Sequence, residues 1–216
     1  MAKPILLQVH DQNLQQLADV VRPYHQEYCD KNDYQYLVVK KNDYDAGKNV
    51  YWNRIPVFLN ILEHVADGSE LYYLDLDALI VRRNIKLGTA FLLPKSVYGL
   101  VPCVTHHFED VYYNTGAVYI RNHNSIRSFL KQVWDLGPTE QVPELGEEPR
   151  INDLLKRTEI EFEALNTKWN AFTQAPHPNP VVKAWHGIPD QYILNQVKAE
   201  IERVLISEAR HHESGS

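Results

Sequence analysis

The stretch LYYLDLDALIV, from Leu71 to Val81, decides the fold that we expect for this chain. It is apolar and rich in β-forming residues, which predicts a strand that is buried on both faces of a sheet. Its charged residues, Asp75 and Asp77, lie toward its carboxyl end. Because successive strand side chains point to opposite faces, we expect the two carboxylates on the same face.

Two neighbouring carboxylates at the edge of an apolar core need a compensating partner. A divalent metal with oxygen ligands is the simplest such partner, and ligands of open α/β sheets bind outside the carboxyl ends of the strands. One interpretation is therefore a D-x-D metal clamp made by Asp75 and Asp77. The alternative is that the strand ends at Asp75 and that both aspartates cap a turn.

The composition bounds the class of protein. The chain has 216 residues, of which 44% are hydrophobic, and this favours one domain over residues 1–216 with a polar, frayed tail from about 207 onward. The net charge of −6, without a Lys/Arg cluster, makes nucleic acid a poor candidate partner. Thirteen Tyr and four Trp residues instead suit a site that stacks rings or sugars.

The cysteine content and the missing signals favour a cytoplasmic setting. Cys29 and Cys103 are the cysteines of the chain, and it has no N-terminal hydrophobic segment of signal or anchor length. It also has no Asn-x-Ser/Thr sequon. These absences predict a reducing compartment and no membrane span.

The first half of the chain alternates between strands and helices, which predicts a parallel, Rossmann-like α/β sheet covered by helices. No G-x-G-x-x-G or G-x-x-x-x-G-K-[ST] motif is present, so a bound nucleotide would be held by another device, such as a metal on its diphosphate. The expected elements are a strand at Pro4–His10, a helix with a kink or restart at Pro23, a strand at Gln35–Val39 and a helix over Trp52–Ala66.

The second half continues the pattern with less regular spacing. A turn-like Asn114, Thr115 and Gly116 is expected to precede a strand that ends near Asn122. The other expected elements are a strand at Val97–Val101, an amphipathic helix over Ile126–Trp134, a short helix from Ile151, a strand at Ile160–Leu165, a late strand at Val181–Gly187 and a closing helix over Ile193–Leu205.

The order of the motifs resembles a known family. YYLDLDALIV, then NTGAVYIRN leading into the helix SIRSFLKQVW, then INDLL and AWHG, resembles the metal-dependent GT-A glycosyltransferases over roughly Pro4 to Ile206. The galactosyl- and xylosyltransferase group and small glycosyltransferase domains of algal viruses are the most similar. The resemblance implies a GT-A fold with a mixed, mostly parallel sheet. It also implies an enzyme that moves a sugar from a nucleotide-sugar, expected to be a UDP-sugar, to a hydroxyl of a glycan or glycoprotein acceptor.

The resemblance also implies a metal site. Asp75 and Asp77, with Leu76 between them, match the D-x-D that holds Mn²⁺ or Mg²⁺ against the donor diphosphate, where the metal offsets charge on the leaving phosphate. Asp77 is for this reason also a catalytic candidate. His186 matches the third metal ligand, and Gly187 would let the backbone approach the diphosphate. The alternative for His186 is a structural histidine in an apolar strand.

The same resemblance implies further residues that contact the sugar donor. Asn114, Thr115 and Gly116 match the N-t-G turn near the donor sugar, although an ordinary turn would look the same. Arg54 stands where relatives often carry a lysine and could contact the donor phosphate. Its alternative is a solvated surface arginine.

Asp153 is the candidate catalytic base, because Asn152 and Asp153 fall where relatives carry an acidic pair near the sugar. An inverting path needs such a carboxylate and a retaining path does not, so the stereochemical outcome stays open. Glu147 and Glu148, just before this pair, are interpreted as loop residues in solvent. After Gly187 the chain departs from the family's phosphate-binding lysine, for which Lys183 is a possible substitute.

The base of the nucleotide is expected near the end of the first strand. His10 and Asp11 would border it, and Tyr34 would stack on it. Two other functions remain as alternatives. One is a non-catalytic module that binds a nucleotide-sugar or a carbohydrate on the same fold. The other is a sugar nucleotidyltransferase, which would need a glycine-rich, basic loop where this chain has HDQNLQQLA.

Overall fold

A computed structural model describes residues 2–41, 48–90, 93, 95–103, 112–139, 146–172, 176–185 and 190–214. The strands are β1 (Ile5–His10), β2 (Gln35–Lys40), β3 (Glu70–Leu74), β4 (Ala78–Ile80), β5 (Tyr98–Cys103), β6 (Tyr112–Arg121), β7 (Phe162–Ala164), β8 (Ala171–Phe172) and β9 (Val182–Ala184). The helices are α1 (Gln15–Asn32), α2 (Arg54–His64), α3 (Asn124–Leu136), α4 (Glu148–Leu155) and α5 (Asp190–Ser214).

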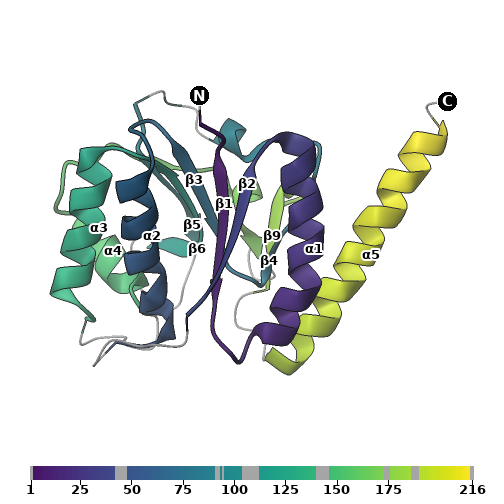
Figure 1. Ribbon diagram of the computed structural model, residues 1–216, viewed down its shortest axis with the longest axis horizontal. Helices are drawn as coiled ribbons and strands as arrows, with labels where there is room; N and C mark the ends of the chain where they lie inside the picture. Colours follow the sequence, from purple (N-terminus) through teal and green to yellow (C-terminus); the bar gives the residue numbers. More distant parts are fainter. Residues whose placement is uncertain are drawn as a thin grey trace.

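A six-stranded sheet in the order β2-β1-β3-β6-β5-β7 forms the centre of the molecule (Figure 1). Strand β6 is antiparallel to both of its neighbours, and the remaining pairs are parallel. The predicted fold class, a mixed and mostly parallel sheet flanked by helices, is therefore confirmed. A smaller sheet in the order β4-β9-β8 lies beside it.

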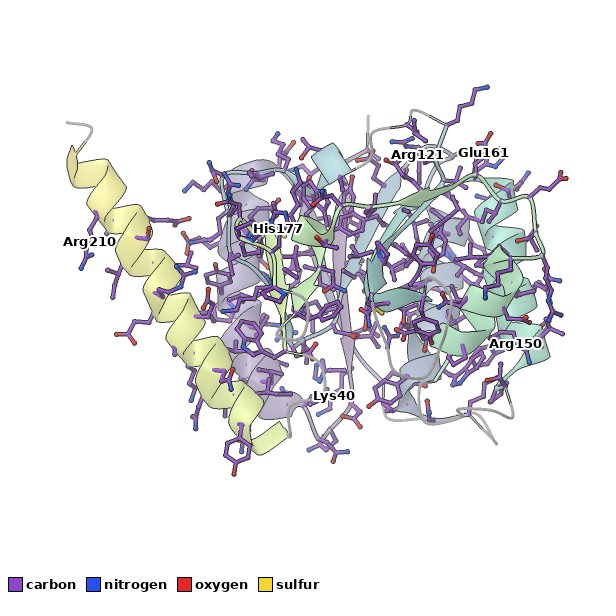
Figure 2. The ribbon with its side chains drawn as sticks, turned by 180° about the vertical axis from the view of Figure 1, so that it is seen from behind. Lys40, Arg121, Arg150, Glu161, His177 and Arg210 are labelled. Atoms are coloured by element: carbon purple, nitrogen blue, oxygen red, sulfur yellow. The ribbon has the colours of Figure 1, made fainter. Side chains whose placement is uncertain are left out.

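Strand β3 shows why both faces of the large sheet are covered. Leu71 and Tyr73 pack on one face with residues of α2 and α3, whereas Tyr72 and Leu74 pack on the other face with Tyr28 of α1. Each fully buried leucine stabilises such a layer by about 1.5–3 kcal/mol. Helix α5 packs outside α1, and its far end near Arg210 extends away from the sheets (Figure 2).

The expected strand Leu71–Val81 is in fact two strands, β3 and β4, which belong to different sheets. Between them the amide of Ala78 donates a hydrogen bond to the carbonyl of Asp75 over 3.0 Å, which closes a turn. The interpretation that placed Asp75 and Asp77 on one strand face was wrong, because β3 ends at Leu74. Of the alternative, the strand end and the turn are confirmed, whereas capping of the turn by both aspartates stays a prediction. This turn carries the chain from one sheet to the other.

Strand β6 differs from the expectation in a similar way. Asn114, Thr115 and Gly116 lie inside the strand and not in a turn before it. The pairing with β5 shifts there, because Leu100 pairs with Val118 while Val101 pairs with Asn114. The residues between these partners form a bulge, which re-aims side chains and backbone groups locally.

Helix boundaries differ less. Helix α1 continues through Pro23 without a restart, and α3 ends before Gly137 as predicted. The late strand is shorter than expected, since β9 ends at Ala184, and α5 continues to Ser214, into the segment that was expected to fray. Within the described ranges, no helix combines the length and the apolar character that crossing a bilayer would need.

Candidate functional site

The carboxyl ends of β1 and β3 open into a cleft of about 240 Å³. These strands are parallel neighbours, so residues far apart in the sequence meet at one edge of the sheet. The residues that line the cleft include six of the predicted site residues, namely His10, Asp11, Arg54, Asp75, Leu76 and Asp77. The cleft is therefore the place where a functional site is best supported.

Asp75 is held firmly at the mouth of this cleft. Its amide donates to the carbonyl of Gly116 over 2.8 Å, and its carbonyl accepts from Ala78 and from Nε2 of Gln8 at 3.2 Å. Its carboxylate accepts a hydrogen bond from the Tyr73 hydroxyl. The side chain nevertheless remains 27% exposed, so a ligand in the cleft can reach it.

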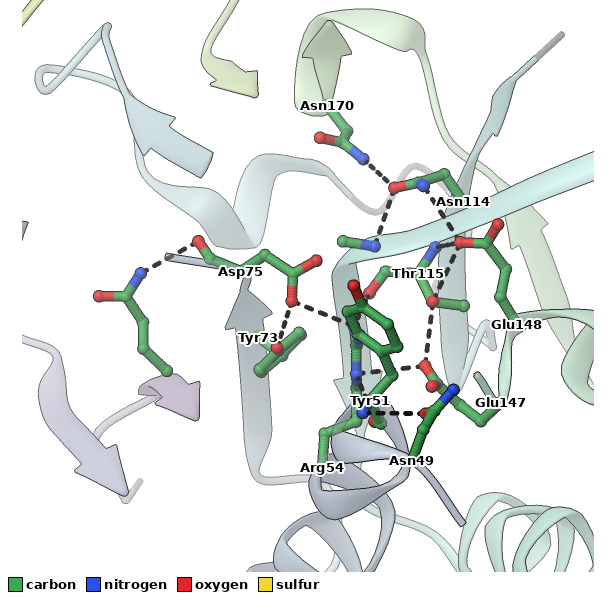
Figure 3. A network of polar contacts seen from close by, with 12 residues as sticks. Asn49, Tyr51, Arg54, Tyr73, Asp75, Asn114, Thr115, Glu147, Glu148 and Asn170 are labelled. Carbon is green, nitrogen blue, oxygen red and sulfur yellow. Dashed lines mark hydrogen bonds and ion pairs between the residues drawn. The ribbon is translucent and has the colours of Figure 1, made fainter. Parts of the chain in front are cut away.

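Arg54 fixes the same carboxylate from the first turn of α2 (Figure 3). Its Nη1 lies 3.2 Å from Oδ1 of Asp75 and donates to the carbonyl of Thr115 over 2.8 Å. Burial by itself would lower the pKa of Arg54, but Asp75 and Glu147 outweigh it and hold this pKa well above its ordinary value. The alternative of a solvated surface arginine was wrong, because Arg54 is only 6% exposed.

Glu147 and Glu148, interpreted from the sequence as loop residues in solvent, belong to this network instead. Glu147 is fully buried, and its Oε1 lies 3.2 Å from Nε of Arg54. The Thr115 hydroxyl donates a hydrogen bond to the same Oε1 over 3.0 Å. Burial raises the pKa of Glu147 to about 7. Oε2 of Glu148 accepts from the amide of Thr115 over 2.8 Å and from Nδ2 of Asn114 over 3.1 Å.

A local signal could have pointed to these glutamates. They immediately precede Pro149 and an apolar-periodic helix, and acidic residues are favoured at such helix starts. What brings Glu147 to Arg54 is the left-handed Gly146 before it, whose φ is 67°. A Cβ at Gly146 would lie 2.5 Å from Cβ of Tyr51, so only glycine allows this close approach.

The N-t-G residues form the back of the site and are not among the described residues that line the cleft. Oδ1 of Asn114 accepts from the amide of Gly116 over 2.8 Å and from Nδ2 of Asn170 over 2.7 Å. Through Glu148 and the carbonyl of Thr115, this bulge connects to Arg54 and so to Asp75 (Figure 3). The bulge thus supports the cleft wall.

Two predicted residues lie apart from the cleft. Tyr34 stands before the amino end of β2, at the opposite edge of the sheet, where its hydroxyl accepts from the amide of Gly88 over 3.2 Å. The expectation that Tyr34 stacks on the base beside His10 and Asp11 was wrong for that reason. Asp153, on α4, is paired with Arg150 of the same helix at 3.3 Å and with Arg157 after its end at 2.6 Å, and it does not line the cleft.

Asn152 and Lys183 make structural contacts outside the cleft. Asn152, and not Asp153, turns toward β6, where its Oδ1 accepts from the amide of Tyr113 over 2.7 Å. Lys183, the substitute for a phosphate-binding lysine, faces α5 and pairs with Glu200 at 2.9 Å. It is not among the described lining residues of the cleft.

Of the remaining predicted residues, His10 and Asp11 line the cleft. Nδ1 of His10 donates to the carbonyl of Asp11 over 2.8 Å, and Oδ1 of Asp11 accepts from the amide of Asn13 over 3.0 Å. His186 and Gly187 lie outside the described residues. Among the residues described, no group of three His, Cys, Asp or Glu side chains could hold a metal.

Comparison with solved structures defines the fold as that of GT-A glycosyltransferases, which confirms the resemblance seen in the motif order. A glycosyltransferase involved in glycosylation of the major capsid of PBCV-1 aligns with 92% of this chain and 100% of its own, with a TM-score of 0.72 and 14% identity. The galactosyltransferase LgtC, in complex with donor and acceptor sugar analogs, aligns with 92% of this chain and 95% of its own, with a TM-score of 0.62 and 13% identity.

A third structure, the glycosyltransferase GlyE of Streptococcus pneumoniae TIGR4, aligns with 94% of this chain and 64% of its own, with a TM-score of 0.52 and 12% identity. The sequence profile of the galactosyl transferase GMA12/MNN10 family matches residues 6–102, which include most of β1, the Asp75–Ala78 turn and most of β5. No curated protein sequence matches significantly.

Proposed function

We propose that the protein is a glycosyltransferase that moves a sugar from a UDP-sugar to a hydroxyl of a glycan acceptor and binds Mn²⁺ or Mg²⁺ through Asp75 and Asp77. The observation that carries the proposal is the meeting of both aspartates with Arg54 in one cleft at the carboxyl edge of the sheet. The GT-A fold and the family match over residues 6–102 support the reaction class. Donor and acceptor sugar analogs bound to LgtC support the substrate classes.

The donor set fits a hard divalent cation. Asp75 and Asp77 offer carboxylate oxygens, which are the ligands that Mn²⁺ and Mg²⁺ take most readily in proteins. When bound, the metal would offset negative charge on the leaving diphosphate. We assign the third protein ligand to His186, because the amide of the preceding Trp185 donates to the carbonyl of Asp77 over 3.1 Å.

The chain's own residues supply orientation and charge. Arg54 holds the Asp75 carboxylate in place through their ion pair, and we assign the base of the nucleotide to the side of the cleft bordered by His10 and Asp11. We place the donor sugar toward Asn114 and Glu148, since the Glu148 carboxylate bonds to Asn114 and is only half-buried, unlike that of Glu147. The free thiols of Cys29 and Cys103 suit the reducing cytoplasm in which we place the reaction.

The proposal is tested by hydrolysis of a UDP-sugar panel with Mn²⁺ and with a chelator. Metal-dependent release of UDP from one donor, lost in Asp77→Ala, is the expected result. Metal-dependent binding of a donor without any turnover, with or without glycan acceptors, would favour the rival function, a non-catalytic nucleotide-sugar-binding module. Equal UDP affinity with Mn²⁺ and with the chelator would contradict both the metal site and this proposal.

A further inference from the structure

A buried polar cluster lies behind the Asp75–Ala78 turn, on the side away from Arg54. It consists of Gln8 on β1, His25 on α1 and Tyr36 on β2, and both Gln8 and His25 are fully buried. The surrounding side chains are those of an apolar layer, so each polar group there needs a hydrogen-bond partner. These polar groups bond to one another and to backbone groups on both sides of the turn, at Asp75 and at Ile80.

The hydrogen bonds of this cluster have a defined direction. The amide of Ile80 can only donate, and it donates to Nε2 of His25 over 3.3 Å. Burial, with a smaller effect of Arg83, lowers the pKa of His25 to about 3, so the imidazole is neutral and Nδ1 carries its proton. Nδ1 of His25 therefore donates to Oε1 of Gln8 over 3.1 Å.

The orientation of Gln8 follows from these donors. Oε1 of Gln8 accepts from His25 and also from the Tyr36 hydroxyl at 2.5 Å, so the amide group Nε2 must point the other way. Nε2 donates to the carbonyl of Asp75 over 3.2 Å. A single buried network thus holds the carbonyl at the start of the turn and, through His25, the amide of Ile80 after it.

We propose that Gln8 and His25 are positioning residues that set the geometry of the Asp75–Ala78 turn, and with it the metal affinity of the site. Neither side chain lines the cleft, so their effect reaches the ligand only through the backbone of the turn. This inference rests on the proposed function, because it assigns the consequence of the turn geometry to metal binding by Asp75 and Asp77.

A purely structural role would give a different result, and the chain offers a matched control. Asn122 is also a buried carboxamide, 1% exposed, and its Nδ2 donates to the carbonyls of Leu62 and Val65 at 2.9 Å each. It lies at the other end of the sheet, beside the end of α2. Gln8→Met and Asn122→Leu each remove a buried carboxamide at nearly constant volume, so both should destabilise the fold.

The experiment measures the Mn²⁺ dissociation constant at saturating UDP by calorimetry, together with urea unfolding, for wild type and both variants. Gln8→Met should raise this constant by about tenfold, as changes to residues that orient metal ligands commonly do, and Asn122→Leu should leave it unchanged. A wild-type constant in folded Gln8→Met, or an equal rise in both variants, would overturn the inference while the proposed function stands. Wild-type protein that binds UDP equally with and without Mn²⁺ would refute the proposed function and this inference with it.

A milder variant keeps the test decisive if Gln8→Met does not fold. Tyr36→Phe removes one of the two donors to Oε1 of Gln8 and leaves the half-buried ring in place. The amide can then rotate away from the Asp75 carbonyl, so the Mn²⁺ dissociation constant should rise in the same direction, by about two- to fivefold if about 0.4–1 kcal/mol is lost. An unchanged constant in Tyr36→Phe would count against the inference.

Discussion

The guanidinium of Arg54 is paired on two sides, with Asp75 Oδ1 3.2 Å from its Nη1 and Glu147 Oε1 3.2 Å from its Nε. These contacts join the first turn of α2 to the end of β3 and to the start of α4. Removing one member of such a buried group leaves an uncompensated charge, which costs more than the pair contributes. The position of the Asp75 carboxylate therefore depends on Arg54 and Glu147 together.

Arg54→Met should lower the free energy of unfolding by about 3 kcal/mol or more, because Asp75 and Glu147 lose their cation. The control is Arg157→Met, which removes an arginine whose side chain is 71% exposed and is paired with Asp153. That change should stay within about 0.5 kcal/mol. Urea unfolding of both variants makes the measurement, and similar losses would show that Arg54 is not a buried anchor.

Asp77→Ala should abolish metal-dependent UDP binding and leave the fold intact, because Asp77 lies in the turn and lines the cleft. Asp67→Ala, at an aspartate that is 65% exposed and paired with Arg127, is the matched control and should bind as the wild type does. Calorimetry with Mn²⁺ and with a chelator gives the comparison. Retained metal dependence in Asp77→Ala would remove this residue from the metal site.

His186→Ala should weaken Mn²⁺ binding at saturating UDP by at least about tenfold if the histidine is the third ligand. The alternative, a structural histidine, predicts a loss of stability with unchanged affinity. Measuring the Mn²⁺ dissociation constant and the urea midpoint of the same variant separates the two. An affinity equal to that of the wild type would mean that the match to the late H-G motif was misleading.

Glu147 should make stability depend on pH. Burial raises its pKa in the folded protein to about 7, whereas an unfolded glutamate titrates near about 4.3. The folded state then binds more protons, so the contribution of this group is fully present below the unfolded pKa and is lost as pH rises toward 7. Urea unfolding between these limits should show this loss, and Glu147→Gln should reduce it. An identical pH profile in the variant would contradict the assignment.

Glu148→Gln should lower the rate of transfer by about 100-fold or more if the carboxylate acts on the reacting sugar or acceptor. Asp153→Asn should have a smaller effect, because Asp153 is already held by Arg150 on its own helix and by Arg157 just after that helix. The measurement is kcat with donor affinity determined separately. A large loss of kcat in Asp153→Asn with donor binding intact would restore the sequence-based prediction of a catalytic Asp153.

The sequence by itself determined the elements whose signals are local. The alternating pattern of apolar strands and helices predicted β1, β2, α2 and α3 close to their observed bounds, because 3.6-residue and two-residue periodicities follow from each element's own geometry. It also placed His10, Asp11, Asp75 and Asp77 at strand ends. Parallel strands bring such ends to one edge, which is why these residues share the cleft.

Only the tertiary structure decided what surrounds Asp75. β-forming residues fill β3 and β4 alike, so the local sequence allowed both a continuous strand and a turn at Asp75, and the choice between them depends on the pairing of β4 with β9 far along the chain. In the same way, the local sequence marks Glu147 as a residue at a helix start, but its burial against Arg54 follows only from the close approach that Gly146 allows. Burial and charge pairing are set by contacts between distant segments, and for this reason sequence pattern alone missed Glu147, Glu148 and Gln8.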